Sequence, residues 1–433
     1  MAVKIHPDAR VFFDGYLGAI GINKKSQNSL KTRNDQQQFL LWLASKGVFS
    51  PSIRRIDREY FDELVKRGFI VSDNDSGVDD FESERTVFEK FVESTPKDRS
   101  KSPVLLSVCI TNRCNLKCKH CANDSRPDSD SFLSFDDMKS IVDQAGEMGV
   151  MKLTLTGGEP LLHERIFDII DYSSEKISRL GLTTNGYILD KRTAGKIKDR
   201  VDVVKISLDG LQRFHDSFRG SGSYERAINA IKMLSEYGIE TRVQITLVRE
   251  NRFEINELIQ VLNGLGVKRI TIVPVTPAGR AARDMMLSPA EYRAFISGVL
   301  DLLKGVELKS EVELRPLFTF VGKESLKGPL IIGNKYVCEA LRSSLDILPN
   351  GDVIPCSFLH NVVGNVRKSS LMDIWESKES DRIRDLLNAV RNDARCRSCG
   401  YRELCEGGCV ANAFAVNGKI GRDVYCWSKE AVK

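Results

Sequence analysis

Between residues 104 and 276 the sequence repeats one unit six times, a short apolar, β-branched run followed by an amphipathic segment with helical spacing. Six consecutive strand–helix units favour a parallel sheet with right-handed crossovers, either open or closed into a partial barrel. Ligands bind at the carboxyl ends of the strands in such sheets. The expected strands are 104–110, 152–156, 179–183, 203–208, 240–248 and 269–275, and the expected helices include 134–148, 166–176, 224–237 and 255–265.

Residues with unusual chemistry follow the first four of these strands. Cys114, Cys118 and Cys121 form a C-x3-C-x2-C loop after the first strand. Because the carboxyl ends of parallel strands meet at one edge of a sheet, this loop should lie close to the segments that follow the next three strands. Those segments are Gly157-Gly158-Glu159-Pro160, Thr184-Asn185-Gly186 and Asp209-Gly210.

The cysteine loop predicts a metal site. Three thiolates on one tight loop can hold three irons of a four-iron cubane and leave the fourth iron open to a substrate or cofactor. A structural zinc site is the alternative, but zinc prefers four ligands, and only His120 on the same loop could be the fourth. Cys109 lies inside the first expected strand, where we expect a buried, inert thiol.

The cysteine loop and the Gly-Gly-Glu-Pro segment on the second strand resemble the signature of the radical S-adenosylmethionine (radical SAM) family. The resemblance extends over residues 104–276. It implies that Cys114, Cys118 and Cys121 bind a 4Fe-4S cluster whose open iron is chelated by the amino and carboxylate groups of S-adenosylmethionine. One electron then cleaves the sulfonium, and the resulting 5′-deoxyadenosyl radical abstracts a hydrogen atom from the substrate.

The same resemblance implies a set of residues around S-adenosylmethionine. Gly157 and Gly158 let the backbone approach a ligand closely, and Glu159 can accept a hydrogen bond from an ammonium group. Ser207 and Asp209 match the segment that contacts the ribose and carboxylate of the cofactor in the family, although a strand end with an Asx turn is the alternative for Asp209. The predicted cofactor-binding residues are Gly157, Gly158, Glu159, Pro160, Asn185, Ser207 and Asp209.

Seven further cysteines lie in the last 96 residues, where short strands, turns and glycines leave little apolar material for a core. Their spacing resembles the SPASM extension of radical SAM peptide maturases, and we expect metal ligation to stabilise this segment. By that resemblance four cysteines bind a distal cluster and three bind a nearer one, which is then one protein ligand short; a zinc ribbon is the alternative. The distal set is Cys396, Cys399, Cys405 and Cys426, and the nearer set is Cys338, Cys356 and Cys409.

One position departs from the sulfatase-maturing relatives of this family. In those relatives the cysteine that matches Cys356 is followed by an aspartate that acts as a base. Here Ser357 follows Cys356. The departure argues against a formylglycine-forming activity.

The first 98 residues predict a small α+β, winged-helix-like module. Residues 10–13 and 16–22 are expected to be hairpin strands, 34–45 and 57–67 helices, and 69–71 a short strand. The module resembles the PqqD-like elements of ribosomal peptide maturases, which bind a leader peptide as an added strand. A winged-helix adaptor or nucleic-acid binder is the alternative, but no concentrated Lys/Arg face supports DNA binding.

Composition excludes several classes of protein. The 433 residues are 42% hydrophobic and 28% charged with a net charge of +5, which is typical of a globular chain of two or three domains and argues against nucleic-acid or membrane partners. No apolar run approaches membrane-spanning length and no signal peptide is recognisable, so the predicted location is the cytoplasm. The expected domains are the module with its linker (1–98), the barrel (99–282), a bridging region (283–335) and the SPASM domain (336–433).

These features predict an α/β protein, a partial (β/α)6 TIM-like barrel between the N-terminal module and a Cys-rich iron–sulfur domain. The predicted function is oxidative modification, by a thioether or carbon–carbon crosslink, of a ribosomally synthesised precursor peptide. The expected cofactors are S-adenosylmethionine and three 4Fe-4S clusters, one of them in the barrel and two auxiliary. The expected partners are the precursor peptide and an electron donor such as flavodoxin or ferredoxin. The alternatives are a radical SAM enzyme for a small molecule or tetrapyrrole, a peptide epimerase, and a non-catalytic metal scaffold.

Overall fold

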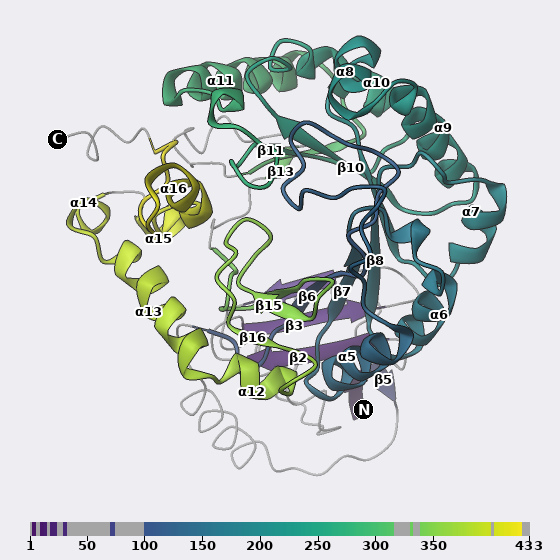
Figure 1. Cartoon of the computed structure of the whole chain (residues 1–433), viewed down its shortest axis with the longest axis vertical. Coiled ribbons are helices and arrows are strands. Elements are labelled where there is room, and N and C mark those ends of the chain that lie inside the picture. The colour runs from purple at the N-terminus through teal and green to yellow at the C-terminus, as the bar shows by residue number, and fades with distance from the viewer. Residues whose placement is uncertain are drawn as a thin grey trace.

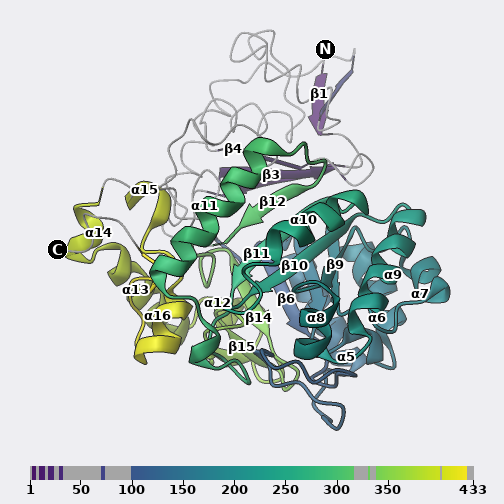
Figure 2. The same cartoon turned by 90° about the horizontal axis from the view of Figure 1, so that it is seen from above.

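The centre of the molecule is a curved sheet with helices on its outer face (Figure 1, Figure 2). The computed structural model describes residues 99–315, 338–399 and 402–426. It also describes shorter strands at 2–5, 9–14, 18–23, 29–32, 70–73 and 330–331.

All six predicted strands of the barrel form, and each pairs in parallel with the next one along the chain. They are β6 (Leu105–Cys109), β7 (Lys152–Thr156), β8 (Arg179–Thr184), β9 (Val203–Ser207), β10 (Thr241–Leu247) and β11 (Arg269–Pro274). The predicted parallel α/β architecture is therefore confirmed.

Helices return the chain between these strands and cover the outer face of the sheet (Figure 1). The first of them begins where the sequence predicts, because Ser134 and Asp137 form a capping box in which each side chain accepts a hydrogen bond from the other residue's backbone N–H. The helices are α5 (Phe135–Glu147), α6 (Ile166–Lys176), α7 (Lys191–Ile197), α8 (Gln212–Arg219), α9 (Ser223–Glu236), α10 (Ile255–Gly264) and α11 (Pro289–Gly305).

Side chains alternate along the strands between an apolar face and a polar face. On the apolar face, Leu153, Val204 and Ile245 are fully buried in one continuous core. The other face carries residues such as Thr154 and Gln244 and lines a cavity inside the curved sheet. A closed parallel barrel fills its interior with packed apolar side chains, so an open, polar interior identifies the place where this fold can hold a ligand.

Two segments extend this sheet beyond the six barrel strands. The bridging region contains β12 (Glu311–Leu314), which is parallel to β11, and β13 (Leu330–Ile331). At the opposite edge β14 (Ser344–Ile347) lies parallel to β6, and β15 (Asp352–Ile354) and β16 (Gly364–Asn365) continue the sheet in antiparallel pairing. One sheet therefore joins the barrel to the Cys-rich segment.

The Cys-rich segment contains more helix and more core than its sequence suggests. The sequence predicts one helix here, at 370–376, and it forms as α12 (Leu371–Trp375). The longer α13 (Lys378–Arg391) follows it and is not predicted. Trp375 and Tyr425 are completely buried and belong to the same apolar core as the barrel. The expectation that this segment has little apolar core is thus corrected, because it shares the core of the barrel. Three short helices complete it: α14 (Ala394–Arg397), α15 (Arg402–Cys405) and α16 (Val410–Asn417).

The N-terminal region contributes β1 (Ala2–Ile5), β2 (Ala9–Asp14), β3 (Gly18–Asn23), β4 (Ser29–Thr32) and β5 (Ile70–Asp73). An antiparallel sheet of β2, β3 and β4 includes the predicted hairpin, and β1 pairs antiparallel with β5. The helices expected at 34–45 and 57–67 lie outside the described residues. The resemblance of this region to PqqD-like elements therefore stays a prediction.

The described helices are too short or too charged to cross a lipid bilayer. The longest of them, α11, has 17 residues and carries Glu291, Arg293, Asp301 and Lys304.

Candidate metal and cofactor sites

Three cysteines lie on a loop at the carboxyl end of β6, as the sequence predicts. We call Cys114, Cys118 and Cys121 the loop cysteines. Cys114 and Cys118 are buried and Cys121 is half-buried. All three line one cavity of about 200 Å³.

Two glycines allow the loop to dock on the end of β7. The Gly158 N–H donates to the Thr111 carbonyl at 2.7 Å, and the Glu159 N–H donates to the Arg113 carbonyl at 2.9 Å. A Cβ atom at Gly157 would lie 2.4 Å from the Thr111 oxygen, and one at Gly158 would lie 2.3 Å from the Arg113 oxygen. Both distances are far inside van der Waals contact, so this docking requires glycine at both positions.

A second segment holds the loop from the other side, after β11. The Arg280 backbone N–H donates to the Cys121 carbonyl at 3.0 Å, and its Nε donates to the Cys118 carbonyl at 2.8 Å. Gly279 has a φ of 58°, and a Cβ there would lie 2.4 Å from the Cys121 oxygen. The sequence analysis missed this clamp; its only sequence signal is a glycine and an arginine after the last predicted strand.

The loop cysteines have the surroundings that an iron–sulfur cluster requires. Burial raises the pKa of Cys114 to about 12 and also raises the pKa of Cys118, so thiolates here need compensation from metal and from hydrogen-bond donors. Each loop sulfur has at least one N–H donor directed at it. These donors are Leu116 N (3.5 Å) and Asn185 Nδ2 (3.8 Å) to Cys114, Arg219 Nη1 (3.9 Å) to Cys118, and Ser125 N (3.4 Å) to Cys121.

Four of the seven predicted cofactor residues line the same cavity as the loop cysteines. They are Gly157, Gly158, Asn185 and Ser207. The structure thus gathers them from the ends of three different strands. Arg280 also lines this cavity, and its Nη2 atom is buried without a hydrogen-bond partner among the described residues. An unpaired donor at this position fits an anionic group such as a carboxylate.

Glu159 is completely buried and lies outside the lining of this cavity. Its carboxylate accepts hydrogen bonds from Thr184 Oγ1 at 2.7 Å, from Asn185 N at 2.8 Å and from Leu161 N at 3.2 Å. Burial raises the pKa of Glu159 to about 7, although these hydrogen bonds act in the opposite direction and lower it. The carboxylate therefore ties the end of β8 to the end of β7, while Pro160 is buried at the start of a short 3-10 helix. Contact of either residue with S-adenosylmethionine stays a prediction.

Asp209 is also buried and orients a cation toward the loop. Its Oδ2 atom contacts Arg219 Nε at 2.5 Å and His120 Nε2 at 3.0 Å, and its Oδ1 accepts from Thr246 N at 2.8 Å. Burial opposes ionisation, but Arg219 and His120 outweigh it and hold the pKa of Asp209 well below its usual range. Arg219 in turn reaches the Cys118 sulfur. The sequence analysis singled out Asp209 but missed Arg219 as its partner.

The remaining predicted ligands fall into two groups. Cys338, Cys356 and Cys409, the inner cysteines, line a second cavity of about 450 Å³. Burial, followed by repulsion from the Cys338 thiol, raises the pKa of Cys356 well above its usual value. The outer cysteines lie apart from this cavity and are Cys396, Cys399, Cys405 and Cys426. That the inner and outer cysteines bind two separate clusters, as the resemblance implies, stays a prediction.

Within the described ranges, no three His, Cys, Asp or Glu side chains converge as they would around a single metal ion.

Cys109 is buried inside β6, and burial raises its pKa far above the usual thiol value. It matches the inert thiol that was expected.

A buried carboxylate lies beside the position where Ser357 replaces aspartate. The Ser357 hydroxyl donates to Asp346 of β14, and burial raises the pKa of Asp346 to about 6. The neighbouring strand therefore supplies an acidic group that the sequence next to Cys356 lacks. Antiparallel pairing of β14 with β15, which places Asp346 opposite Ile354, brings it there, so no motif next to Cys356 identifies it.

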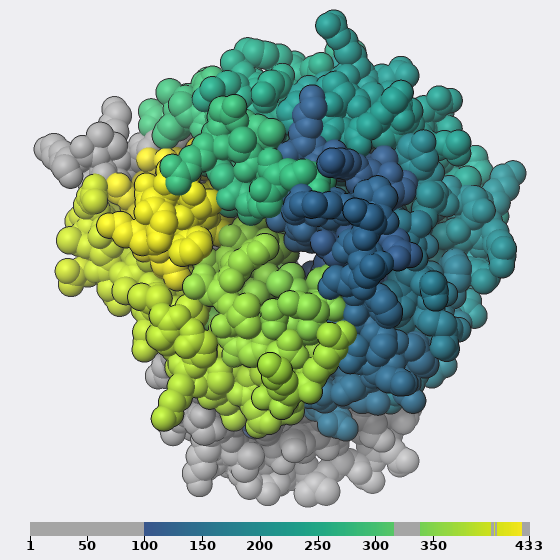
Figure 3. All heavy atoms as spheres, viewed as in Figure 1, coloured from purple at the N-terminus to yellow at the C-terminus, as the bar shows by residue number. Residues whose placement is uncertain are grey.

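The two cavities adjoin each other. Six residues line both of them, and the space-filling view has an opening where the loop region (blue) meets the Cys-rich segment (light green) (Figure 3). The shared residues are Thr183, Gln244, Val273, Pro274, Thr276 and Phe358. The loop cysteines and the inner cysteines therefore line neighbouring cavities that share part of their walls.

Residues 108–262 match the radical SAM superfamily, and residues 338–400 match the iron–sulfur cluster-binding domain SPASM. The chain is therefore a radical SAM enzyme with an SPASM domain, and it uses S-adenosylmethionine. The two matches confirm that the radical SAM domain and the SPASM domain expected from the sequence are present.

Three known proteins illustrate the range of this family. The AdoMet-dependent heme synthase of Nitratidesulfovibrio vulgaris is 28% identical over 75% of this chain and 92% of its own length. The antilisterial bacteriocin subtilosin biosynthesis protein AlbA of Bacillus subtilis is 29% identical over 76% of this chain and 71% of its own length. Streptococcus suis SuiB bound to S-adenosylmethionine has a similar fold over 98% of this chain and 99% of its own, with a TM-score of 0.72 and 22% identity.

Proposed function

We propose that this enzyme is a peptide maturase that oxidatively modifies a ribosomally synthesised precursor peptide, with a thioether or carbon–carbon crosslink as the product. The observation that carries the proposal is the pair of adjoining cavities, one lined by the loop cysteines and the other by the inner cysteines. A substrate in these cavities can lose a hydrogen atom at one end and an electron at the other. Loss of both is the net two-electron oxidation that bond formation requires.

The residues around the loop cysteines suit the cofactors of such an enzyme. The loop cysteines would hold one 4Fe-4S cluster, and the inner and outer cysteines would hold two auxiliary clusters. When bound, the loop cluster and S-adenosylmethionine supply a 5′-deoxyadenosyl radical. The chain itself positions the ligands: Arg280 and the two glycines fix the loop, and Asp209 orients Arg219 toward Cys118.

Two known proteins support a peptide as the substrate. AlbA is named for the biosynthesis of a bacteriocin, and SuiB has been crystallised with its precursor peptide SuiA. In this proposal residues 1–98 bind the leader of the peptide, the barrel of 99–282 generates the radical, and the segment 336–433 places the auxiliary clusters after a bridge of 283–335. A reduced flavodoxin or ferredoxin would deliver the electron to the loop cluster.

A tetrapyrrole substrate is the second candidate, because the heme synthase relatives match a similar share of the chain. The decisive experiment incubates the reconstituted, reduced enzyme with S-adenosylmethionine and the short peptide encoded beside its gene. Mass spectrometry should detect 5′-deoxyadenosine together with a peptide that has lost two hydrogen atoms. Conversion of a tetrapyrrole in place of the peptide would overturn the proposal, and an unchanged peptide mass with deuterium uptake would indicate an epimerase.

Two measurements control this experiment. The Cys118→Ala variant should form no 5′-deoxyadenosine, because it lacks one loop ligand. Three cubanes require about twelve iron atoms per chain. A value near four together with bound zinc would contradict the auxiliary clusters, and product formation by iron-free protein would contradict the radical mechanism itself.

A further inference from the structure

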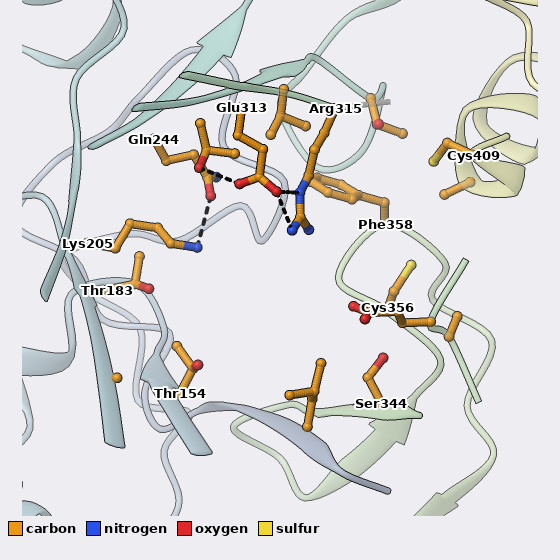
Figure 4. Close-up of a pocket in the computed structure, with 18 of the residues that line it drawn as sticks. Thr154, Thr183, Lys205, Gln244, Glu313, Arg315, Ser344, Cys356, Phe358 and Cys409 are labelled. Carbon is orange, nitrogen blue, oxygen red and sulfur yellow. Dashed lines mark hydrogen bonds and ion pairs between the residues drawn. The ribbon is translucent and has the colours of Figure 1, made fainter. Parts of the chain in front are cut away.

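The interior of the barrel carries several cationic side chains, two of which, Lys205 and Arg315, are labelled in Figure 4. The described lining of the cavity beside the inner cysteines includes five cationic side chains and two carboxylates. The cations are Lys152, Lys205, Arg242, Arg269 and Arg315, and the carboxylates are Glu313 and Glu339. So large an excess of one charge is unusual for a barrel interior, since buried charges in proteins are normally paired.

The arginines in this lining already have carboxylate partners. Each contacts an acidic side chain on its own strand or on the neighbouring one. The pairs and their nitrogen–oxygen distances are Arg242–Glu240 (2.5 Å), Arg269–Glu311 (2.9 Å) and Arg315–Glu313 (2.7 Å). The charges of the arginines are therefore compensated within the fold.

The two lysines differ from the arginines. Within the described part of the chain, neither Lys152 nor Lys205 has a carboxylate at ion-pair distance. Lys205 Nζ donates to Gln244 Oε1 at 3.2 Å and faces the open cavity (Figure 4). Burial, followed by neighbouring cations, lowers the pKa of Lys152 to about 7 and that of Lys205 to about 8. A cation in this position costs free energy, and an anion bound beside it would recover that cost.

Lys205 lies close to both cavities. Lys205 lies two residues before Ser207 on β9, which corresponds to about 7 Å along a strand. Ser207 lines the cavity beside the loop cysteines, and Cys356 lies across the larger cavity from Lys205 (Figure 4). A group bound to Lys205 would therefore lie between the loop cysteines and the inner cysteines.

We propose that Lys205, assisted by Lys152, binds a carboxylate of the substrate inside the barrel. The inference rests on the proposed function, in which this carboxylate is a glutamate or aspartate side chain near the modified residue of the peptide. A tetrapyrrole propionate offers the same chemistry. The test therefore separates these two sources.

The test measures equilibrium binding to the full-length, reconstituted enzyme in the presence of S-adenosylmethionine. The probes are N-acetyl-Gly-Glu-Gly-amide, its Gln counterpart and coproporphyrin III, and ligand-observed NMR gives each dissociation constant. The Glu probe should bind at least about tenfold more tightly than the Gln probe, because a charge-assisted hydrogen bond stabilises it. Lys205→Gln should remove the preference for the Glu probe over the Gln probe, and Lys152→Gln should reduce it. Lys205→Arg should keep it.

Lys232→Gln is the matched control, because Lys232 is an exposed lysine on α9. Iron content and thermal unfolding of every variant establish that it is folded. Equal affinity for the Glu and Gln probes, combined with coproporphyrin binding that Lys205→Gln leaves unchanged, would overturn the site. If coproporphyrin alone binds and Lys205→Gln abolishes its binding, the result supports the carboxylate site and contradicts a peptide as the substrate.

Discussion

At the residue scale, the loop cysteines depend on a backbone contact that only glycine allows. In Gly158→Ala the new Cβ would clash with the Arg113 carbonyl, 2.3 Å away, and the cysteine loop would have to move off the end of β7. We expect the variant to lose the loop cluster, which is about four iron atoms per chain. Iron analysis and 5′-deoxyadenosine formation check this expectation.

A second glycine provides the control for this substitution. Gly264 at the end of α10 has open space where a Cβ would lie. Gly264→Ala should therefore keep the wild-type iron content. Full iron content in Gly158→Ala would disprove the role of the close contact.

The buried pair of Asp209 and Arg219 is the second feature at this scale. Asp209→Asn leaves Arg219 without its charged partner in a buried site, and breaking such a pair costs about 3–5 kcal/mol. We expect a loss of this order in the free energy of unfolding, measured by denaturant titration. The double variant Asp209→Asn/Arg219→Met should recover part of it, because the unpaired charge is then gone. Additive losses in the double variant would contradict the pairing.

At the scale of elements, the loop after β11 clamps the loop after β6. Arg280→Ala removes the hydrogen bonds to the Cys118 and Ser125 carbonyls and the ion pair with Asp124. The Cys118 carbonyl keeps the Cys121 N–H at 3.4 Å, but the carbonyl of the buried Ser125 loses its partner, and an unpaired buried carbonyl costs about 1–3 kcal/mol. We expect the cysteine loop to open more often and a chelator to remove the loop iron several times faster than from wild type.

The rate of iron release to the chelator is followed by absorbance. Arg192→Ala is a suitable control, because Arg192 is exposed on α7, away from the cysteine loop. Equal rates of iron release from wild type and Arg280→Ala would show that Arg280 does not hold the cysteine loop in place.

The same scale limits what sequence patterns reveal. The six barrel strands were predicted because each combines β-branched residues with a buried face, whereas β12 has only four alternating residues and gains its place by pairing with β11. The helix α13 was missed because its mean hydropathy is low. Its buried residues, Ile383 and Leu387, complete a core that the barrel supplies.

At the scale of the whole molecule, the basic interior predicts a pH dependence of ligand binding. Burial and nearby cations lower the pKa of Lys152 to about 7 and of Lys205 to about 8, so both are charged below pH 7 and both lose their protons as the pH rises past 8. The affinity for the Glu probe should therefore be highest below about pH 7 and should fall above pH 8. The other charged groups around these lysines are Arg179, Arg242, Arg269, Arg315 and Glu313, together with Glu339 in the lining of the same cavity.

The pH titration has an internal control in the Gln probe, whose weaker binding should not change with pH. Lys205→Arg should also shift the fall of Glu-probe affinity to higher pH, because a guanidinium stays charged. An affinity for the Glu probe that rises between pH 7 and 9 would contradict the assignment of these lysines.

The sequence alone determined the chemistry and the order of the parts. The cysteine loop, the glycine pair and the strand–helix repeat are local features, so the loop and the parallel barrel could be predicted from residues close together in the chain, while the two groups of tail cysteines stay a prediction from resemblance. Only the tertiary structure decided which polar groups meet. Four residues have roles that depend on partners, or on a shared cavity, that the folding of the chain brings together. Charge and spacing in the linear sequence do not indicate these contacts. The residues are Arg219, Arg280, Asp346 and Lys205.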